Sequence, residues 1–211
     1  MSNTSTHTAV LWDFGGVILT SPFEAFNRYE REQGLPLDFI RTVNATDPHG
    51  NAWARLERSE VSPIEFDDVF ATESAALGHC IPGRDVLALL SGDVRPEMVA
   101  MLDRVKAAGY LTACLTNNVT GEHASLERGA EIGAIMMRFD AVVESSKIGV
   151  RKPEPRFYEI ACELLGVRPE HCVFLDDLGI NLKPAAAMGM TTIKVVDAAT
   201  AIADLTRILG L

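Results

Sequence analysis

Hydrophobic and polar positions follow different patterns in two parts of the chain. From residue 96 to the C-terminus, short and partly β-branched apolar runs alternate with amphipathic segments of helical period. The predicted strands are Ala9–Trp12, Tyr110–Leu115, Phe139–Val143, Cys172–Leu175 and Thr191–Val196, and the predicted helices are Pro96–Ala108, Glu154–Leu165, Leu182–Met188 and Ala199–Leu209. Strands that alternate with helices in this way predict a parallel sheet with helices on both faces.

The segment between the first strand and residue 96 has helical patterns and few β-branched runs. Ser21–Pro22 predicts a helix N-cap followed by proline at the first helical position. Ser62–Glu65 predicts a capping box that opens a second helix, in which Phe66 and Phe70 share a face. This segment is therefore expected to be helical throughout.

A chain of 211 residues corresponds to one domain, or to one domain with an insertion. We expect an α/β fold with a Rossmann-like parallel sheet, and a small helical domain inserted after the first strand. The predicted core comprises residues 1–20 and 96–211, and the predicted helical insertion comprises residues 21–95.

The charge and the lengths of the apolar runs argue against a nucleic-acid partner and against a membrane span. The net charge is −10, from 19 basic and 29 acidic residues, and the basic residues form no run. A nucleic-acid-binding protein presents a basic face, so no nucleic-acid partner is expected. Uninterrupted apolar runs are only a few residues long, so no membrane span is expected either.

Cysteine use and the N-terminal sequence favour a cytoplasmic protein. The four cysteines, Cys80, Cys114, Cys162 and Cys172, are scattered without a CxxC motif, and we expect them to be reduced and buried. The first eight residues are polar and contain no apolar segment typical of a signal peptide. No feature of the sequence specifies an oligomeric state.

Polar side chains follow three of the predicted strands. Asp13 ends the first strand, Thr116 and Asn117 end the second, and Asp176 and Asp177 end the fourth. One such aspartate would be an ordinary turn residue. Ligands of open parallel sheets bind beyond the carboxyl ends of the strands, so three polar strand ends together predict a functional site.

At these residues the sequence resembles the haloacid dehalogenase (HAD) superfamily of hydrolases. Four motifs match in order: Leu11–Val17, Leu115–Asn117, Arg151–Pro153 and Phe174–Asp177. The stretch from residue 149 to 190 is especially similar to the subgroup that contains the N-terminal phosphatase domain of soluble epoxide hydrolase. The resemblance implies that the helical insertion is a cap over the site, and that the substrate is a small phosphorylated metabolite.

The resemblance implies that Asp13 is a nucleophile. A carboxylate and a phosphate ester repel each other, so their approach requires cations. A hard cation with oxygen ligands, Mg²⁺, can bridge both groups. By the resemblance, Mg²⁺ is held by Asp13, the backbone carbonyl of Gly15 and Asp177, although the adjacent Asp176 is an alternative ligand to Asp177.

The resemblance also assigns roles to the other motif residues. Lys152 neutralises the nucleophile and the phosphate, and the Thr116 hydroxyl holds the phosphoryl oxygens, although Thr116 could simply cap the next helix. Asn117 is assigned to substrate binding together with Thr116 and Lys152. Asp176 orients Lys152 or a metal-bound water, and Asn181 supports the metal loop.

Gly15 departs from the family pattern. Most phosphatases of this family carry a second aspartate two residues after the nucleophile, where it protonates the leaving group and then activates water. A group of this kind contributes about 10²- to 10⁴-fold to the rate. The sequence therefore favours a phosphatase that tolerates the loss, through a good leaving group or an acid supplied by the cap or the substrate.

Two other functions stay open. A non-hydrolytic module that binds phosphorylated ligands would need no acid at residue 15. A haloacid dehalogenase attacks carbon and needs no acid for halide, but such enzymes need no Mg²⁺, whereas the paired Asp176 and Asp177 suit a metal. The dehalogenase is therefore the least favoured.

Several residues of the insertion could face the site. We expect the polar ones to be solvated surface residues, and the aromatic ones to form the core of the cap. These residues are His49, Arg55, Arg58, His79 and Arg84, and Phe23, Phe26, Trp53 and Phe66.

Overall fold

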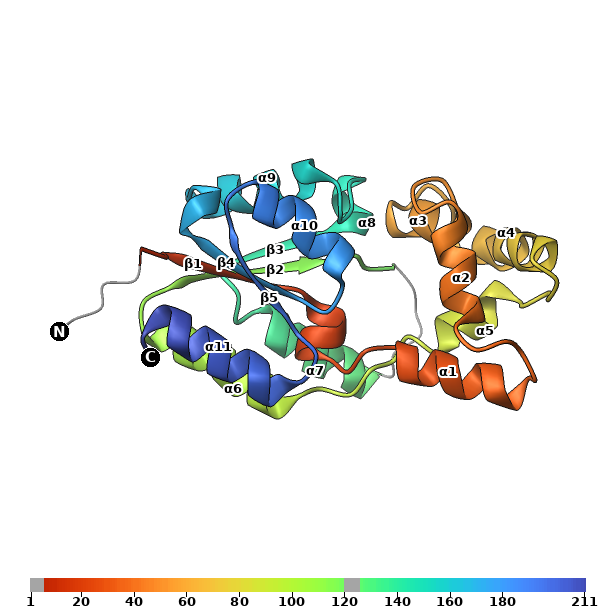
Figure 1. Cartoon of the computed structure of the whole chain (residues 1–211), viewed down its shortest axis with the longest axis horizontal. Coiled ribbons are helices and arrows are strands. Elements are labelled where there is room, and N and C mark those ends of the chain that lie inside the picture. Colours follow the sequence, from red (N-terminus) through yellow and green to blue (C-terminus); the bar gives the residue numbers. More distant parts are fainter. Residues whose placement is uncertain (1–5, 120–125) are drawn as a thin grey trace.

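The computed structural model describes residues 6–119 and 126–211, and the chain forms one parallel sheet. The strands are β1 (Ala9–Trp12), β2 (Leu111–Thr116), β3 (Ala141–Glu144), β4 (Cys172–Asp176) and β5 (Thr191–Lys194). Their order is β3-β2-β1-β4-β5, and each strand runs parallel to its neighbours (Figure 1). The predicted α/β class is confirmed. The first strand has the predicted ends, and the others differ by one or two residues at one or both ends.

Helices cover both faces of the sheet (Figure 1). They are α6 (Pro96–Ala107), α7 (Leu126–Met136), α8 (Ser145–Ile148), α9 (Pro155–Leu165), the short η2 (Pro169–His171), α10 (Gly179–Ala187) and α11 (Ala198–Leu209). One face packs against α6, α7 and α11, and the opposite face packs against α9 and α10. Met98, Met101, Leu102 and Val105 of α6 recur at helical spacing and are all buried.

The segment between β1 and α6 is helical and has its own apolar core. Its helices are α1 (Phe23–Glu32), α2 (Phe39–Thr46), α3 (Ala52–Glu57), α4 (Pro63–Ala76) and α5 (Gly83–Ala88). They lie beyond one end of the sheet (Figure 1) and pack around Phe26, Ile40, Phe66 and Phe70. The predicted capping box is confirmed, because Ser62 accepts from the Glu65 amide and Glu65 accepts from the Ser62 amide.

The chain crosses to the helical segment and back along paired backbone. Leu19 and Val94 form an isolated antiparallel bridge. The Thr20 amide donates to the Asp93 carbonyl at 2.8 Å, and the Arg95 amide donates to the Ile18 carbonyl at 2.9 Å. The two connections therefore run side by side.

Some local predictions were wrong. The N-cap of α1 is Pro22, not Ser21, and the Ser21 hydroxyl donates instead to Asp177. Helix α10 begins at Gly179, three residues before the predicted start. Cys80 is exposed, because it lies in the connection after α4, whereas Cys114, Cys162 and Cys172 are buried; all four thiols are free.

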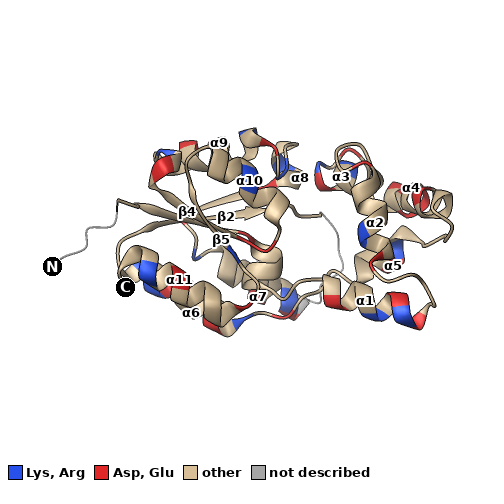
Figure 2. Ribbon diagram, viewed as in Figure 1, with Lys and Arg blue, Asp and Glu red and all other residues tan. Residues whose placement is uncertain are grey.

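The surface fits the expected charge pattern. In the view of Figure 2, basic and acidic residues are interspersed along the helices. Within the described ranges, no helix is both long enough and apolar enough to cross a membrane.

Candidate active site

Asp13 lies at the end of the central strand, where a tight turn begins. The turn is the one-turn helix η1 (Phe14–Ile18), and the Asp13 carboxylate accepts from the Phe14 amide at 2.6 Å. Gly16 in this turn has a φ of +77°, and a Cβ there would lie 2.2 Å from a carboxylate oxygen of Asp177. Only glycine therefore allows the turn to approach Asp177 so closely.

Lys152 is buried between two carboxylates. Its ammonium lies 2.7 Å from Asp13 and 2.8 Å from Asp176, and the side chain is 1% exposed. Burial alone would lower the pKa of Lys152, but Asp13 and Asp176 outweigh it and hold this pKa above its usual range. The lysine is therefore a fixed positive charge beside Asp13.

Asp176 has hydrogen-bond partners for both of its oxygens. It accepts from the Lys152 ammonium, from the Leu178 amide at 2.8 Å and from the Asn181 side chain at 3.1 Å, and it is fully buried. These bonds fix the loop after β4. Asp176 thus contacts both Lys152 and Asn181.

The three aspartates form a cluster that could hold a cation. One carboxylate oxygen from each of Asp13, Asp176 and Asp177 lies within 4.8 Å of the others. Burial raises the pKa of Asp13 even beside Lys152. Burial, together with Asp176, raises the pKa of Asp177 to about 6. A divalent cation would stabilise both carboxylates in their charged forms, and an all-oxygen donor set suits a hard ion.

The end of β2 contributes Thr116 and Asn117. Thr116 is buried and lines the cavity described below. The Asn117 side chain accepts from the Lys152 amide at 2.8 Å and donates to the Lys152 carbonyl at 3.0 Å. Asn117 therefore braces the backbone on both sides of the lysine. Asn118 donates to Glu144 at 3.0 Å, which fits a residue that shapes the turn.

A cavity of about 640 Å³ lies between these groups and the helical segment. Asp13, Thr116, Lys152 and Asp177 are among the residues of the sheet end that line it. Much of the remaining lining is apolar. The apolar lining residues are Phe14, Leu19, Pro22, Phe23, Phe26, Ala45, Pro48, Trp53, Leu90, Val119, Pro153, Leu178 and Ile180.

The aromatic residues of the helical segment divide into two groups. Phe23, Phe26 and Trp53 line the cavity as well as packing in the helical core, whereas Phe66 lies behind Trp53 with ring centroids 5.8 Å apart. The expectation that all four form core alone was therefore incomplete. Helical spacing identifies an apolar face but does not reveal which of its members border a cavity.

The polar residues of the helical segment also differ from the expectation in part. His49 lines the cavity. Arg84 pairs with Asp67 instead, and His79 packs edge-on against Phe39. Sequence reasoning missed other polar lining residues, because they lie in no motif. They are Arg41, Asn44, Asn51 and Glu57.

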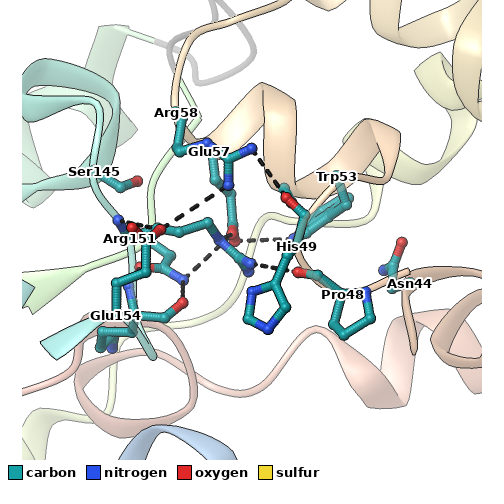
Figure 3. Close-up of polar contacts among 12 residues, drawn as sticks. Asn44, Pro48, His49, Trp53, Glu57, Arg58, Ser145, Arg151 and Glu154 are labelled. Carbon is teal, nitrogen blue, oxygen red and sulfur yellow. Dashed lines mark hydrogen bonds and ion pairs between the residues drawn. The ribbon is translucent and has the colours of Figure 1, made fainter. Parts of the chain in front are cut away.

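The helical segment contacts the loop that carries Lys152 (Figure 3). Arg151 forms an ion pair with Glu57 and donates to the Pro48 carbonyl at 2.9 Å. Arg58 donates to the His49 carbonyl at 3.0 Å and lies 4.0 Å from Glu154. Residues of both parts of the chain therefore enclose the cavity.

The sequence motifs predicted this arrangement. In the structure, Asp13 follows the central strand of a parallel sheet, and Lys152 and the adjacent Asp176 and Asp177 lie beside it. A sequence profile of haloacid dehalogenase-like hydrolases matches residues 7–189, and the chain belongs to this family.

Individual relatives include phosphatases and larger proteins. The chain is 31% identical to mouse acyl-CoA dehydrogenase family member 10, over 97% of this chain and 19% of that protein. It is 35% identical to rat bifunctional epoxide hydrolase 2, over 94% of this chain and 38% of that protein. It is 25% identical to the sesquiterpene phosphatase astK of Aspergillus oryzae, over 98% of both. The chain thus spans less than two fifths of the first two relatives.

Solved structures share the fold. A dehalogenase with an intermediate complex superposes with a TM-score of 0.68 at 18% identity, over 98% of this chain and 99% of that one. A HAD family enzyme from Bacteroides thetaiotaomicron, in complex with magnesium and inorganic phosphate, superposes with a TM-score of 0.58 at 18% identity, over 89% and 93%.

The buried charges predict a pH-dependent effect of Lys152→Met. The change leaves Asp13 and Asp176 buried without their ammonium, so the free energy of unfolding at neutral pH should fall by about 3–5 kcal/mol. Burial already raises the pKa of Asp13, and the variant should raise it further. The folded variant then binds protons more tightly than the unfolded chain, so its stability falls as pH rises above about 4.

Urea denaturation in EDTA, from pH 4 to 8, measures this effect. The difference between wild type and variant should be smallest at the acid end. A difference that is the same at every pH would mean that the lysine contributes through packing alone.

Proposed function

We propose that the protein is a Mg²⁺-dependent phosphatase that hydrolyses phosphate monoesters through an aspartyl-phosphate on Asp13. The observation that carries this proposal is the pair of buried ion pairs that Lys152 forms with Asp13 and Asp176. These ion pairs lie beside Asp177 at one end of the cavity. The phosphatase relative and the magnesium and phosphate complex of a structural neighbour support it.

Each residue contributes one part of the reaction. A carboxylate oxygen of Asp13 attacks phosphorus while the bond to the ester oxygen breaks, and water then attacks the phosphorus to release phosphate and free Asp13. Lys152 neutralises charge on the nucleophile and the phosphoryl group, and Thr116 donates to a phosphoryl oxygen. Asp176 positions Lys152.

The donor set fits Mg²⁺. Asp13, the Gly15 carbonyl and Asp177 would hold the ion, because Asp176 already has hydrogen-bond partners for both oxygens, whereas Asp177 has a weaker one in Ser21 at 3.2 Å. When bound, the ion would supply positive charge between the carboxylates and the phosphoryl group. Asn181 supports the loop through its bonds to Asp176.

Gly15 leaves the usual position of the acid empty. A Cβ at this residue would meet nothing within 4 Å, and the backbone, with φ −68° and ψ 134°, is open to any residue. Packing therefore does not require glycine here. We propose that the substrates carry leaving groups that depart without a proton, as aryl and acyl phosphates do.

The cavity lining favours a substrate with an apolar group. Phe23, Phe26 and Trp53 border the cavity, and burying an apolar group against such side chains gives binding energy. We propose that residues 21–95 act as a cap that binds this group, over a core of residues 1–20 and 96–211. The free thiols of the buried cysteines fit the expected cytoplasmic location.

The metal assignment predicts that Asp177→Ala weakens Mg²⁺ binding. The affinity should fall by at least about tenfold. Replacing a residue that only supports a metal ligand already lowers metal affinity by about this factor, and Asp177 is assigned as a ligand itself. Isothermal titration calorimetry measures it, with Asp204→Ala on the outer surface of α11 as the control. Unchanged affinity in Asp177→Ala would place the ion elsewhere.

The missing acid predicts a dependence on the leaving group. Wild-type protein should hydrolyse aryl or acyl phosphates far faster than alkyl phosphates. Gly15→Asp should help alkyl phosphates most, by up to about 10²- to 10⁴-fold, because a positioned acid then protonates the leaving oxygen. Steady-state kinetics over a series of leaving-group pKa values measures both effects.

Asp13→Asn is the control for this series and should abolish turnover of every substrate. Turnover by the wild type that does not vary with leaving-group pKa would mean that another group acts as the acid. If neither wild type nor Gly15→Asp hydrolyses any phosphate while phosphorylated ligands still bind, the protein is a binding module instead.

The apolar lining predicts a selective effect of Phe23→Ala. Losing the burial of an aromatic side chain costs about 1.5–3 kcal/mol. The kcat/KM for a phosphate ester of a long apolar alcohol should therefore fall roughly 10- to 100-fold. The value for a short ester should change little. Leu77→Ala, at an exposed position after α4, is the control, and equal losses with both esters would contradict an apolar binding site.

A further inference from the structure

Glu57 is a buried acid at the end of α3 that no motif predicted. Its side chain is 7% exposed, and it borders the cavity. Three nitrogen donors converge on its carboxylate. Trp53 donates to one oxygen at 2.9 Å, and both Arg151 and Asn117, the latter at 3.3 Å, donate to the other (Figure 3 shows Glu57 between Trp53 and Arg151).

Two of these three donors belong to the segments that hold Lys152. Arg151 immediately precedes the lysine in the chain. Asn117 binds the Lys152 amide and carbonyl with the same side chain that donates to Glu57. The Glu57 carboxylate thus contacts two residues that fix the Lys152 backbone. Arg151 is bonded to it covalently, and Asn117 is hydrogen-bonded to it.

From these contacts we propose that Glu57 is a positioning residue, which fixes the Arg151–Lys152 loop and Asn117 when the helical segment lies over the core. The inference rests on the proposed phosphatase function and deepens it. Lys152 must lie within hydrogen-bond distance of Asp13, and its own backbone is held by Asn117. A small displacement of that backbone would move the ammonium away from the reacting groups.

The stability of the helical segment does not account for a charge at this position. The segment has an apolar core of its own. Burial raises the pKa of Glu57 despite the ion pair with Arg151, so its charged form is held at a cost to folding. Three N–H groups face the carboxylate, so its contacts with Arg151 and Asn117 explain the buried acid better than the packing of the segment does.

Two other contacts between the helical segment and the core include exposed residues. Arg58 and Glu154 lie 4.0 Å apart, and Ser59 donates to the Ser146 carbonyl at 3.0 Å on the surface. Neither contact reaches Asn117. Glu60, which pairs with Arg58 within the helical segment, offers a matched control for replacing an acid by its amide.

The first test compares Glu57→Gln with Glu60→Gln. A glutamine has one oxygen and one amide group, so it must direct N–H donors at the donors that now bind Glu57. We expect kcat to fall about 10- to 100-fold in Glu57→Gln. A displacement of the Lys152 ammonium by about 1 Å or less would have an effect of this size. The factor should be the same for all leaving groups, and KM should change little. The melting temperature should fall, because buried N–H groups lose their acceptor, so kcat is compared well below the melting temperature of each variant.

Arg151→Met completes a double-mutant cycle. If Glu57 acts through Arg151 and the loop, Glu57→Gln should cost much less kcat in the Arg151→Met background than in wild type. Full additivity would overturn the proposal. So would a loss of kcat that disappears well below the melting temperature of the variant, where all of it is folded. A loss that grows with leaving-group pKa would also overturn the proposal, because it would make Glu57 a proton donor.

The second test needs no turnover. Hydrogen exchange of the Lys152 backbone amide, followed by NMR, reports the bond from this amide to Asn117. Exchange should be faster in Glu57→Gln than in wild type and unchanged in Glu60→Gln. Equal exchange in all three proteins would overturn the positioning role. Faster exchange in a protein that hydrolyses no phosphate would support the positioning contact while refuting the phosphatase function.

Discussion

The buried ammonium of Lys152 is the interaction on which the rest of the site depends. Two carboxylates from neighbouring strands, Asp13 after β1 and Asp176 in β4, would repel each other in a water-poor environment without a cation between them. The lysine stabilises both, but it must itself be held, because a buried charge is tolerated only with close partners. Asn181 orients one carboxylate, and Asn117 holds the lysine backbone.

The sheet explains how residues far apart in sequence meet at this ammonium. Trp12 is paired with Cys114 on one side and with Leu175 on the other, so Asp13, Thr116 and Asp176 emerge at neighbouring strand ends. Strands β1 and β4 are buried along their whole length, and β2 is buried from Thr112 onward. The charged groups are thus positioned by buried strands, while the helical segment supplies the apolar wall of the cavity.

Sequence reasoning recovered the parts that local rules determine. Short apolar runs gave the strands, the Ser62 capping box gave the start of α4, and polar strand ends indicated the site. The contacts between distant segments could not be predicted in this way. Ser21 has the chemistry of an N-cap, but its hydroxyl binds Asp177, and nothing near Glu57 in sequence indicates that it meets Arg151. Such pairings depend on how the helical segment packs on the sheet end, which no local pattern encodes.

The antiparallel bridge between Leu19 and Val94 has a consequence for how this fold can vary. The two connections between the sheet and the helical segment are hydrogen-bonded to each other beside this bridge. These bonds set the distance between the end of η1 and the start of α6, whatever the structure of the helical segment. Residues can be gained, lost or exchanged between positions 21 and 92 without pulling on β1. New cavity walls can therefore arise over the same strand ends, as long as contacts such as that of Glu57 with Arg151 are kept.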